Sequence, residues 1–75
     1  MERITKLVLF DYGRNAWSWL HIYRPAYAGA GEFREYKMYG EQVAALYDSF
    51  TKRFGLPTRT ANVVIGRRFE WEFAG

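Results

Sequence analysis

Aromatic and polar side chains recur at every second position between residues 16 and 24, as Trp17, Trp19, His21 and Tyr23. A period of two predicts a β-strand that points these four side chains to one face and the intervening residues to the other. Rings on a strand surface can stack on the bases of single-stranded nucleic acid, or they can fill the centre of a protein–protein interface. The row is therefore the first candidate for a binding surface.

Basic side chains lie near this row in the sequence. Lys6 is expected on the neighbouring strand, and Arg14 and Arg24 are expected at the ends of the aromatic strand. A second basic spot can form around residue 67, although adjacent arginines on a strand point to opposite faces. The net charge of +3 permits a nucleic-acid or acidic protein partner and requires neither. The predicted binding residues are Trp17, Trp19, His21, Tyr23, Arg14, Arg24, Lys6, Arg59, Arg67 and Arg68.

Catalytic and metal chemistry find little support in the sequence. His21 is the only histidine, and Asp11 is expected near it across the first hairpin. Ser18 has the opposite parity from His21 on the same strand, so the two side chains face away from each other. No Ser–His–Asp arrangement is therefore predicted. One histidine and no cysteine leave no zinc-type ligand cluster. The glycines of residues 29–31 lack the Gly-Lys-Ser/Thr ending of a phosphate loop. We expect a protein that is not an enzyme, with no metal or cofactor.

Length and composition predict one small domain over residues 1–75, stabilised by aromatic mass because a disulfide is impossible without cysteine. Aromatic residues make up 20% of the chain. Residues 1–6 contain no apolar core of a signal peptide, and no apolar run approaches the roughly 18 residues of a membrane span. We therefore expect a soluble, cytoplasmic protein that does not insert into a membrane.

The first half of the chain predicts three strands. The run over 3–12 has apolar side chains on both faces, which indicates a strand in the centre of the sheet. A turn follows at 12–15, where Gly13 and Asn15 accept a positive φ at low cost, so 16–24 becomes the second arm of a hairpin. After a small-residue loop, the mixed polarity of 33–39 indicates a third strand at an edge of the sheet.

One helix is predicted over 41–54. Gly40 is the expected N-cap, Gly55 the expected residue after the last turn, and Leu56 is expected to fold back on Phe50. The helix-spaced apolar stripe that supports this prediction consists of Val43, Leu46, Tyr47, Phe50 and Phe54.

The tail over 61–73 allows two interpretations. The pattern that favours one long strand bent at Gly66 is the odd position of Val63, Ile65, Phe69, Trp71 and Phe73. A hairpin turning at Gly66 and Arg67 would mix polar and apolar residues on each face. We therefore expect an α+β fold in β-β-β-α-β order: a small antiparallel sheet of about four strands, with one amphipathic helix packed on one face.

A helix of about 14 residues is roughly 21 Å long and 10 Å across, so it covers about half of one sheet face. The apolar surface that the helix leaves uncovered must be covered in another way: by strong curling of the sheet, by a second copy of the chain or by a partner. We interpret the chain as a non-catalytic binding module that engages a protein through its aromatic and basic sheet surface, in the manner of a small phage-encoded inhibitor or an adaptor of a larger machine. The alternatives are direct binding of single-stranded nucleic acid by the same face, and a homodimer whose interface is that face.

Overall fold

The computed structural model describes residues 4–24 and 33–73, and the glycine-containing loop predicted at 25–31 lies outside them. The strands and the helix follow the order β-β-β-α-β-β. Their bounds are β1 Lys6–Asp11, β2 Trp17–Tyr23, β3 Phe33–Tyr39, α1 Gly40–Phe54, β4 Arg59–Val63 and β5 Gly66–Glu72.

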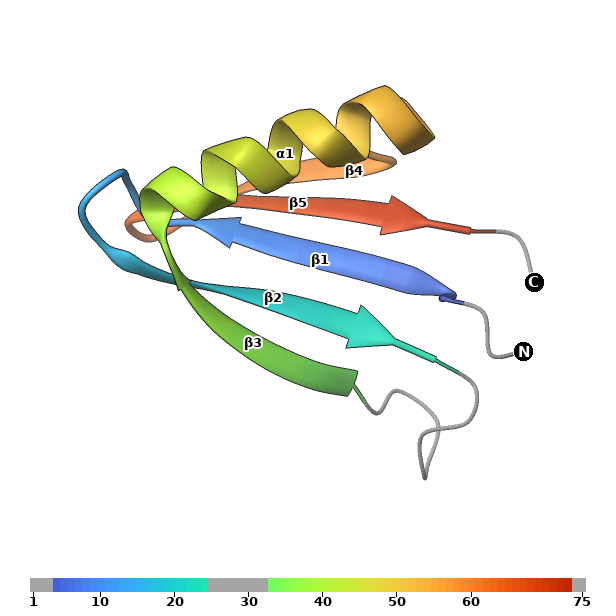
Figure 1. Ribbon diagram of the computed structural model, residues 1–75, viewed down its shortest axis with the longest axis horizontal. Helices are drawn as coiled ribbons and strands as arrows, with labels where there is room; N and C mark the ends of the chain where they lie inside the picture. Colours follow the sequence, from blue (N-terminus) through green and yellow to red (C-terminus); the bar gives the residue numbers. More distant parts are fainter. Residues whose placement is uncertain (1–3, 25–32, 74–75) are drawn as a thin grey trace.

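All neighbouring strands of the five-stranded sheet are antiparallel, in the order β3-β2-β1-β5-β4. The helix α1 runs along one face of the sheet (Figure 1). The α+β class, the first hairpin, the central place of β1 and the edge place of β3 are confirmed. The number of strands is five rather than about four.

The bent strand predicted over 61–73 is wrong, because residues 59–72 form a hairpin. Val63 lies opposite Gly66, so the turn consists of Val64 and Ile65 rather than of Gly66 and Arg67. Both turn residues are exposed, at 101% and 72%. The odd-numbered apolar pattern therefore has no structural meaning at Ile65, which contributes nothing to the core.

Gly66 is needed for close approach rather than for a bend. A Cβ at this position would lie 2.0 Å from the carbonyl oxygen of Asp11, on the adjacent strand β1. The glycine therefore lets the start of β5 pass next to the end of β1. From the sequence, the same glycine looked like the point at which a strand bends.

The core lies between α1 and one face of the sheet. From β2 this face takes Ser18, Leu20 and Ile22, as the predicted parity requires, and Trp71 of β5 is the largest fully buried side chain. The indole nitrogen Nε1 of Trp71 donates a hydrogen bond to the carbonyl oxygen of Gly55, at 3.0 Å. The buried apolar cluster consists of Leu7, Leu9, Leu20, Val43, Phe69 and Trp71.

The start of α1 differs from the prediction, because Tyr39 is the N-cap and Gly40 is the first helical residue. The backbone N–H of Tyr39 donates to the side chain of Gln42, at 3.0 Å. A Cβ on Gly40 would lie 1.7 Å from the carbonyl oxygen of Gly13. Glycine is therefore required because the β1–β2 turn packs directly on the helix start.

The β1–β2 turn uses a positive φ at Gly13 alone, where φ is 113°, and the expectation for Asn15 is wrong. At the other end of α1, Gly55 has φ 87° and donates its N–H to Thr51, as expected after a last turn. Leu56 is 81% exposed, so the predicted contact with Phe50 is also wrong. Phe50 packs edge-on against Trp71 instead, with ring centroids 5.2 Å apart.

Candidate interaction surface

The sheet face opposite α1 carries a group of rings that we call the aromatic face. Among the residues that the structure describes, the only helix lies on the other side of the sheet, so no helix covers this group. The strand residues involved alternate with core residues of β1, β2 and β3. The aromatic face consists of Phe10, Tyr12, Trp17, Trp19, His21, Tyr23, Phe33 and Tyr39.

His21 lies in the middle of the aromatic face between two phenylalanine rings. Its ring stacks on Phe33 at a centroid distance of 4.1 Å and meets the edge of Phe10 at 5.1 Å. Its Nε2 lies 2.7 Å from Oε2 of Glu35, which is directly opposite on β3. Ser18 is fully buried under α1, where its hydroxyl accepts the backbone N–H of Tyr12. The geometry thus makes His21 a packed and hydrogen-bonded residue.

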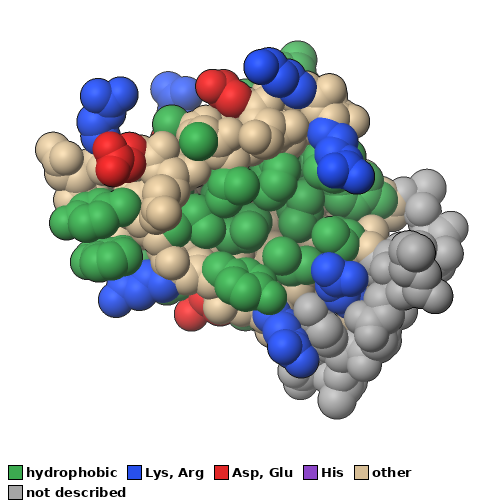
Figure 2. Space-filling view, in the orientation of Figure 1, with side chains coloured by type: hydrophobic (Ala, Val, Ile, Leu, Met, Phe, Trp, Pro, Cys, Tyr) green, Lys and Arg blue, Asp and Glu red, His purple; other side chains and the backbone are tan. Residues whose placement is uncertain are grey.

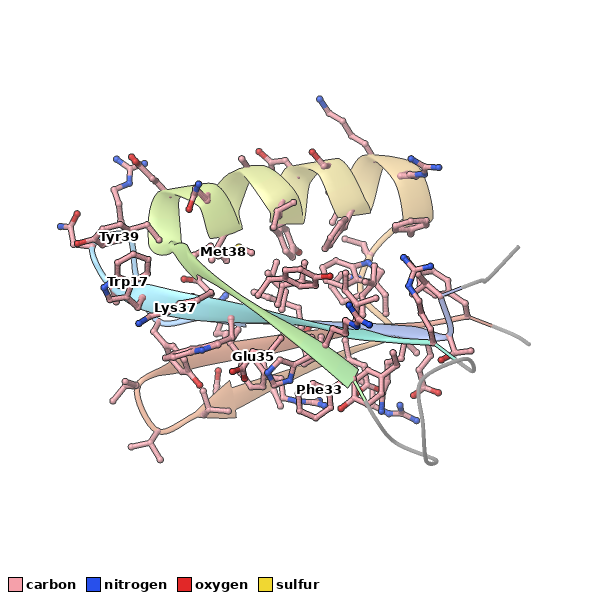
Figure 3. The ribbon with its side chains drawn as sticks, turned by 60° about the horizontal axis from the view of Figure 1, so that its bottom comes forward. Trp17, Phe33, Glu35, Lys37, Met38 and Tyr39 are labelled. Carbon is pink, nitrogen blue, oxygen red and sulfur yellow. The ribbon has the colours of Figure 1, made fainter. Side chains whose placement is uncertain are left out.

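The end of the aromatic face near the start of α1 is the more exposed one. Trp17 is 49% exposed and stacks on Tyr39, with centroids 4.5 Å apart and planes 20° from parallel. The Lys37 ammonium group lies 4.8 Å from the centroid of the Trp17 ring. These residues lie together at one end of the sheet, whereas Phe33 and Glu35 lie toward the other end of β3 (Figure 3).

The opposite end of the aromatic face is centred on Tyr23. Its ring contacts Phe33, at a centroid distance of 5.1 Å, and the Lys6 ammonium group lies 4.3 Å above it. Trp19, farther along β2, meets Tyr12 edge to face at 5.8 Å. Each lysine of this surface therefore already lies over a ring of the same surface, and such cation–π contacts hold the ammonium groups close to the sheet.

Arginines and glutamates on the same side of the sheet form a second cluster on β4 and β5. Glu70 is only 5% exposed and binds Arg59 at 2.7 Å and Arg68 at 2.9 Å, while Arg59 also binds Glu72. Burial alone would raise the pKa of Glu70. The hydrogen bond and charge of Arg68, the charge of Lys6 and the hydrogen bond from Arg59 outweigh burial and lower that pKa from its ordinary value.

The structure brings seven of the ten predicted binding residues to one side of the sheet. Arg67 lies on the α1 side, opposite Asp11 in the register, so Arg59, Arg67 and Arg68 do not form one patch. Arg24 lines a hollow with Phe54 and Phe73 on the α1 side. Arg14 is exposed in the β1–β2 turn. The seven that share a side are Lys6, Trp17, Trp19, His21, Tyr23, Arg59 and Arg68.

Sequence reasoning missed the contribution of β3 to the aromatic face. Phe33, Glu35, Lys37 and Tyr39 all lie on this side, directly opposite Tyr23, His21, Trp19 and Trp17 of β2. Their shared odd parity was visible in the sequence. The register between the two strands was not, because it depends on a connection of nine residues, 24–32, whose length alone does not fix the pairing.

A second apolar surface lies beside α1, on the core side of the sheet. A hollow of about 440 Å³ opens there between the helix and β2. Hydrophobic side chains gather below α1 in this view, with Lys and Arg side chains around the right-hand end (Figure 2). One helix thus leaves part of its own sheet face open. The apolar residues that line the hollow are Ile4, Leu7, Leu20, Ile22, Leu46, Phe50 and Phe54.

No protein family model, curated protein or solved structure matches this chain. Within residues 4–24 and 33–73, no helix is long and apolar enough to cross a membrane. In the same two segments, no three His, Asp or Glu side chains are grouped so that they could hold a metal ion.

Proposed function

We propose that the protein is a non-catalytic binding module whose aromatic face docks onto a protein partner. The observation that carries this proposal is the exposure of large rings on a sheet face that no helix of the described residues covers: 49% for Trp17, 42% for Phe33 and 43% for Tyr39. Tyrosine and tryptophan are enriched at protein interfaces, where a few such side chains supply most of the binding energy.

The charges around the rings favour a protein over nucleic acid. Arg59 and Arg68 are held by Glu70, and Glu35 and Glu72 add further negative charge to the same side of the sheet. Binding to single strands depends on cations that neutralise phosphates. A surface on which arginines already pair with glutamates suits a partner of mixed charge better than a polyphosphate.

A module of this size can act as an adaptor or as an inhibitor that occludes a site on a larger machine. The rings Trp17 and Tyr39 are stacked on each other before any partner arrives, so little side-chain freedom is lost when they are covered. A cytoplasmic location belongs to the same proposal. Single-stranded nucleic acid and a second copy on the aromatic face remain the competing partners for this surface.

Affinity capture with the purified protein, followed by calorimetry with the purified captured protein, tests the proposal. We expect Trp17→Ala and Tyr39→Ala each to weaken binding at least about tenfold, as central aromatic contacts do. Leu56→Ala is the control, because Leu56 is a large apolar side chain that is more exposed than either ring and lies outside the aromatic face. Circular dichroism confirms that each variant stays folded.

Two results would overturn the proposal. One is a captured protein whose affinity is the same for the wild type and for Trp17→Ala. The other is tight binding of a fluorescent oligothymidine with an affinity that falls steeply as salt rises, which would assign the face to nucleic acid. A protein complex centred on the rings depends only weakly on salt.

A further inference from the structure

The strand β3 is an edge strand of seven residues, and within residues 4–24 and 33–73 no strand pairs with its outer edge. β3 pairs with β2 on one side, and in the described part of the chain no strand lies on its other side. All of its residues are exposed except Met38, which is intermediate. Such an edge presents a row of backbone N–H and C=O groups that can pair with a further strand.

The order of side chains along β3 is self-complementary about Tyr36. Glu35 and Lys37 flank this residue with opposite charges, and Phe33 and Tyr39 lie three positions away on either side. If the strand is turned end for end about Tyr36, each glutamate meets a lysine and each phenylalanine meets a tyrosine.

We propose that two copies of the chain pair through β3, antiparallel, with the two-fold axis at Tyr36. Glu35 of each copy then lies opposite Lys37 of the other, and Phe33 lies opposite Tyr39. Directly opposed residues of an antiparallel pair point to the same face, so both contacts form on the aromatic face. Glu35 binds His21 through Oε2. Its second oxygen, Oε1, then accepts a hydrogen bond from the ammonium group of Lys37 in the second copy.

The same charges disfavour other pairings of this edge. Parallel pairing in register sets Glu35 against Glu35 and Lys37 against Lys37, and like charges directly opposite each other destabilise a sheet. Moving the antiparallel axis to position 35 or 37 brings two glutamates or two lysines together on the axis. The charge order therefore selects one register and opposes open-ended stacking.

The other edge of the sheet lacks this complementarity. β4 has five residues, and pairing it with itself about Ala61 sets Arg59 opposite Val63, with no pair of opposite charges. Self-association is therefore assigned to β3 alone. The two five-stranded sheets become one continuous sheet, with both helices on one side and both aromatic faces joined on the other.

Charge reversal tests the pairing, with sedimentation equilibrium across a concentration range as the readout. We expect the wild type to approach twice the monomer mass as concentration rises. Glu35→Lys sets lysines opposite each other at two places, and Lys37→Glu does the same with glutamates. Each variant alone should dimerise at least about tenfold more weakly than the wild type.

Mixing the two single variants is the decisive experiment. In the mixed pair, the two lysines of Glu35→Lys face the two glutamates of Lys37→Glu, so we expect a heterodimer to form where neither variant dimerises alone. The double variant Glu35→Lys/Lys37→Glu should regain homodimerisation. Lys52→Glu, an equal charge change on an exposed helical residue, should dimerise like the wild type.

A disulfide test reports the axis directly, because the chain contains no cysteine. Under mild oxidation, Tyr36→Cys should cross-link to itself. Arg34→Cys should not, since pairing about position 36 separates the two copies of residue 34 by about four residues, or roughly 13 Å. A monomer at every concentration, a mixture that stays monomeric, or oligomers that grow beyond a dimer would each overturn the proposal.

Discussion

Replacing Trp71 by phenylalanine tests how α1 is held on the sheet. The Trp71 side chain is 1% exposed, and its Nε1–H donates to the carbonyl oxygen of Gly55, the residue that ends the helix. Its ring also packs against the rings of Phe50 and Tyr47, with centroid distances of 5.2 Å and 5.9 Å. Trp71→Phe removes the hydrogen bond and part of the packing while keeping an aromatic side chain in the core.

The cost follows from these two losses. Phenylalanine lacks about three of the indole ring atoms, and at about 0.8 kcal/mol for each buried methylene-sized group this is about 2.4 kcal/mol. The hydrogen bond adds about 1 kcal/mol. The sum is about 3 kcal/mol, a large share of the roughly 4–11 kcal/mol expected for a domain of this length.

Urea unfolding followed by far-ultraviolet circular dichroism measures this loss without using tryptophan fluorescence. With a slope of about 1 kcal/mol per molar urea, typical of the smallest domains, the midpoint should fall by about 3 M. An isosteric benzothiophene analogue at position 71 removes only the N–H, and should cost about 1 kcal/mol. If Trp71→Phe lowers the unfolding free energy by less than about 1 kcal/mol, the account of this side chain as the link between α1 and β5 is wrong.

Two further perturbations test the helix start and the buried glutamate. Gly40→Ala should destabilise the protein by about 3 kcal/mol or more, because its Cβ would meet backbone atoms 1.7 to 2.8 Å away. In Gly13→Ala the added Cβ meets no neighbour within 4 Å, so this variant should lose only about 1–2 kcal/mol through backbone strain. Thermal melts of the two variants test this difference in stability. The lowered pKa of Glu70 means that its carboxylate stabilises the fold fully above about pH 4.5 and progressively less as the pH falls through that lowered pKa. The stability difference between the wild type and Glu70→Gln, measured by urea titration from about pH 6 to about pH 2, should therefore shrink at acid pH, and a difference that stays constant would contradict the ion-pair cluster.

Local patterns predicted much of this fold because the features concerned depend on a few adjacent residues. The parity of Trp17, Trp19, His21 and Tyr23 assigned one face of β2 correctly, since side-chain alternation is a property of the strand itself. The helix stripe and the glycine at its end likewise gave the bounds of α1 to within one residue. These parts of the architecture need no knowledge of what lies against them.

The errors arose where a residue's role depends on a distant segment. Gly66 is a glycine because β1 passes within 2.0 Å of where its Cβ would be, and nothing near it in the sequence reports that neighbour. Val64 and Ile65 form a tight turn although both are β-branched, so the usual glycine and asparagine signal of a hairpin was missing. A sequence pattern cannot distinguish an apolar turn of this kind from the middle of a strand.

Only part of the candidate surface could be predicted, because the rest of it also depends on contacts between distant segments of the chain. The rings of β2 could be assigned to one face, but their stacking partners Phe33 and Tyr39 depend on the register between β2 and β3. The pairing of Arg59 with Glu70 depends on the hairpin that the sequence analysis rejected. Sequence reasoning therefore gave the rings of β2 but neither their partners on β3 nor the charge balance of the surface.

The strand order bears on how the chain folds during synthesis. β1 is followed directly in the chain by its neighbour β2, but its second neighbour, β5, follows the helix by more than ten residues. Until β5 arrives, Leu7 and Leu9 lack their opposite residues Trp71 and Phe69. Pairings between strands far apart in the chain also close slowly. A nascent chain that has emerged only as far as α1 therefore presents β1 with one edge paired to β2 and the other edge still open.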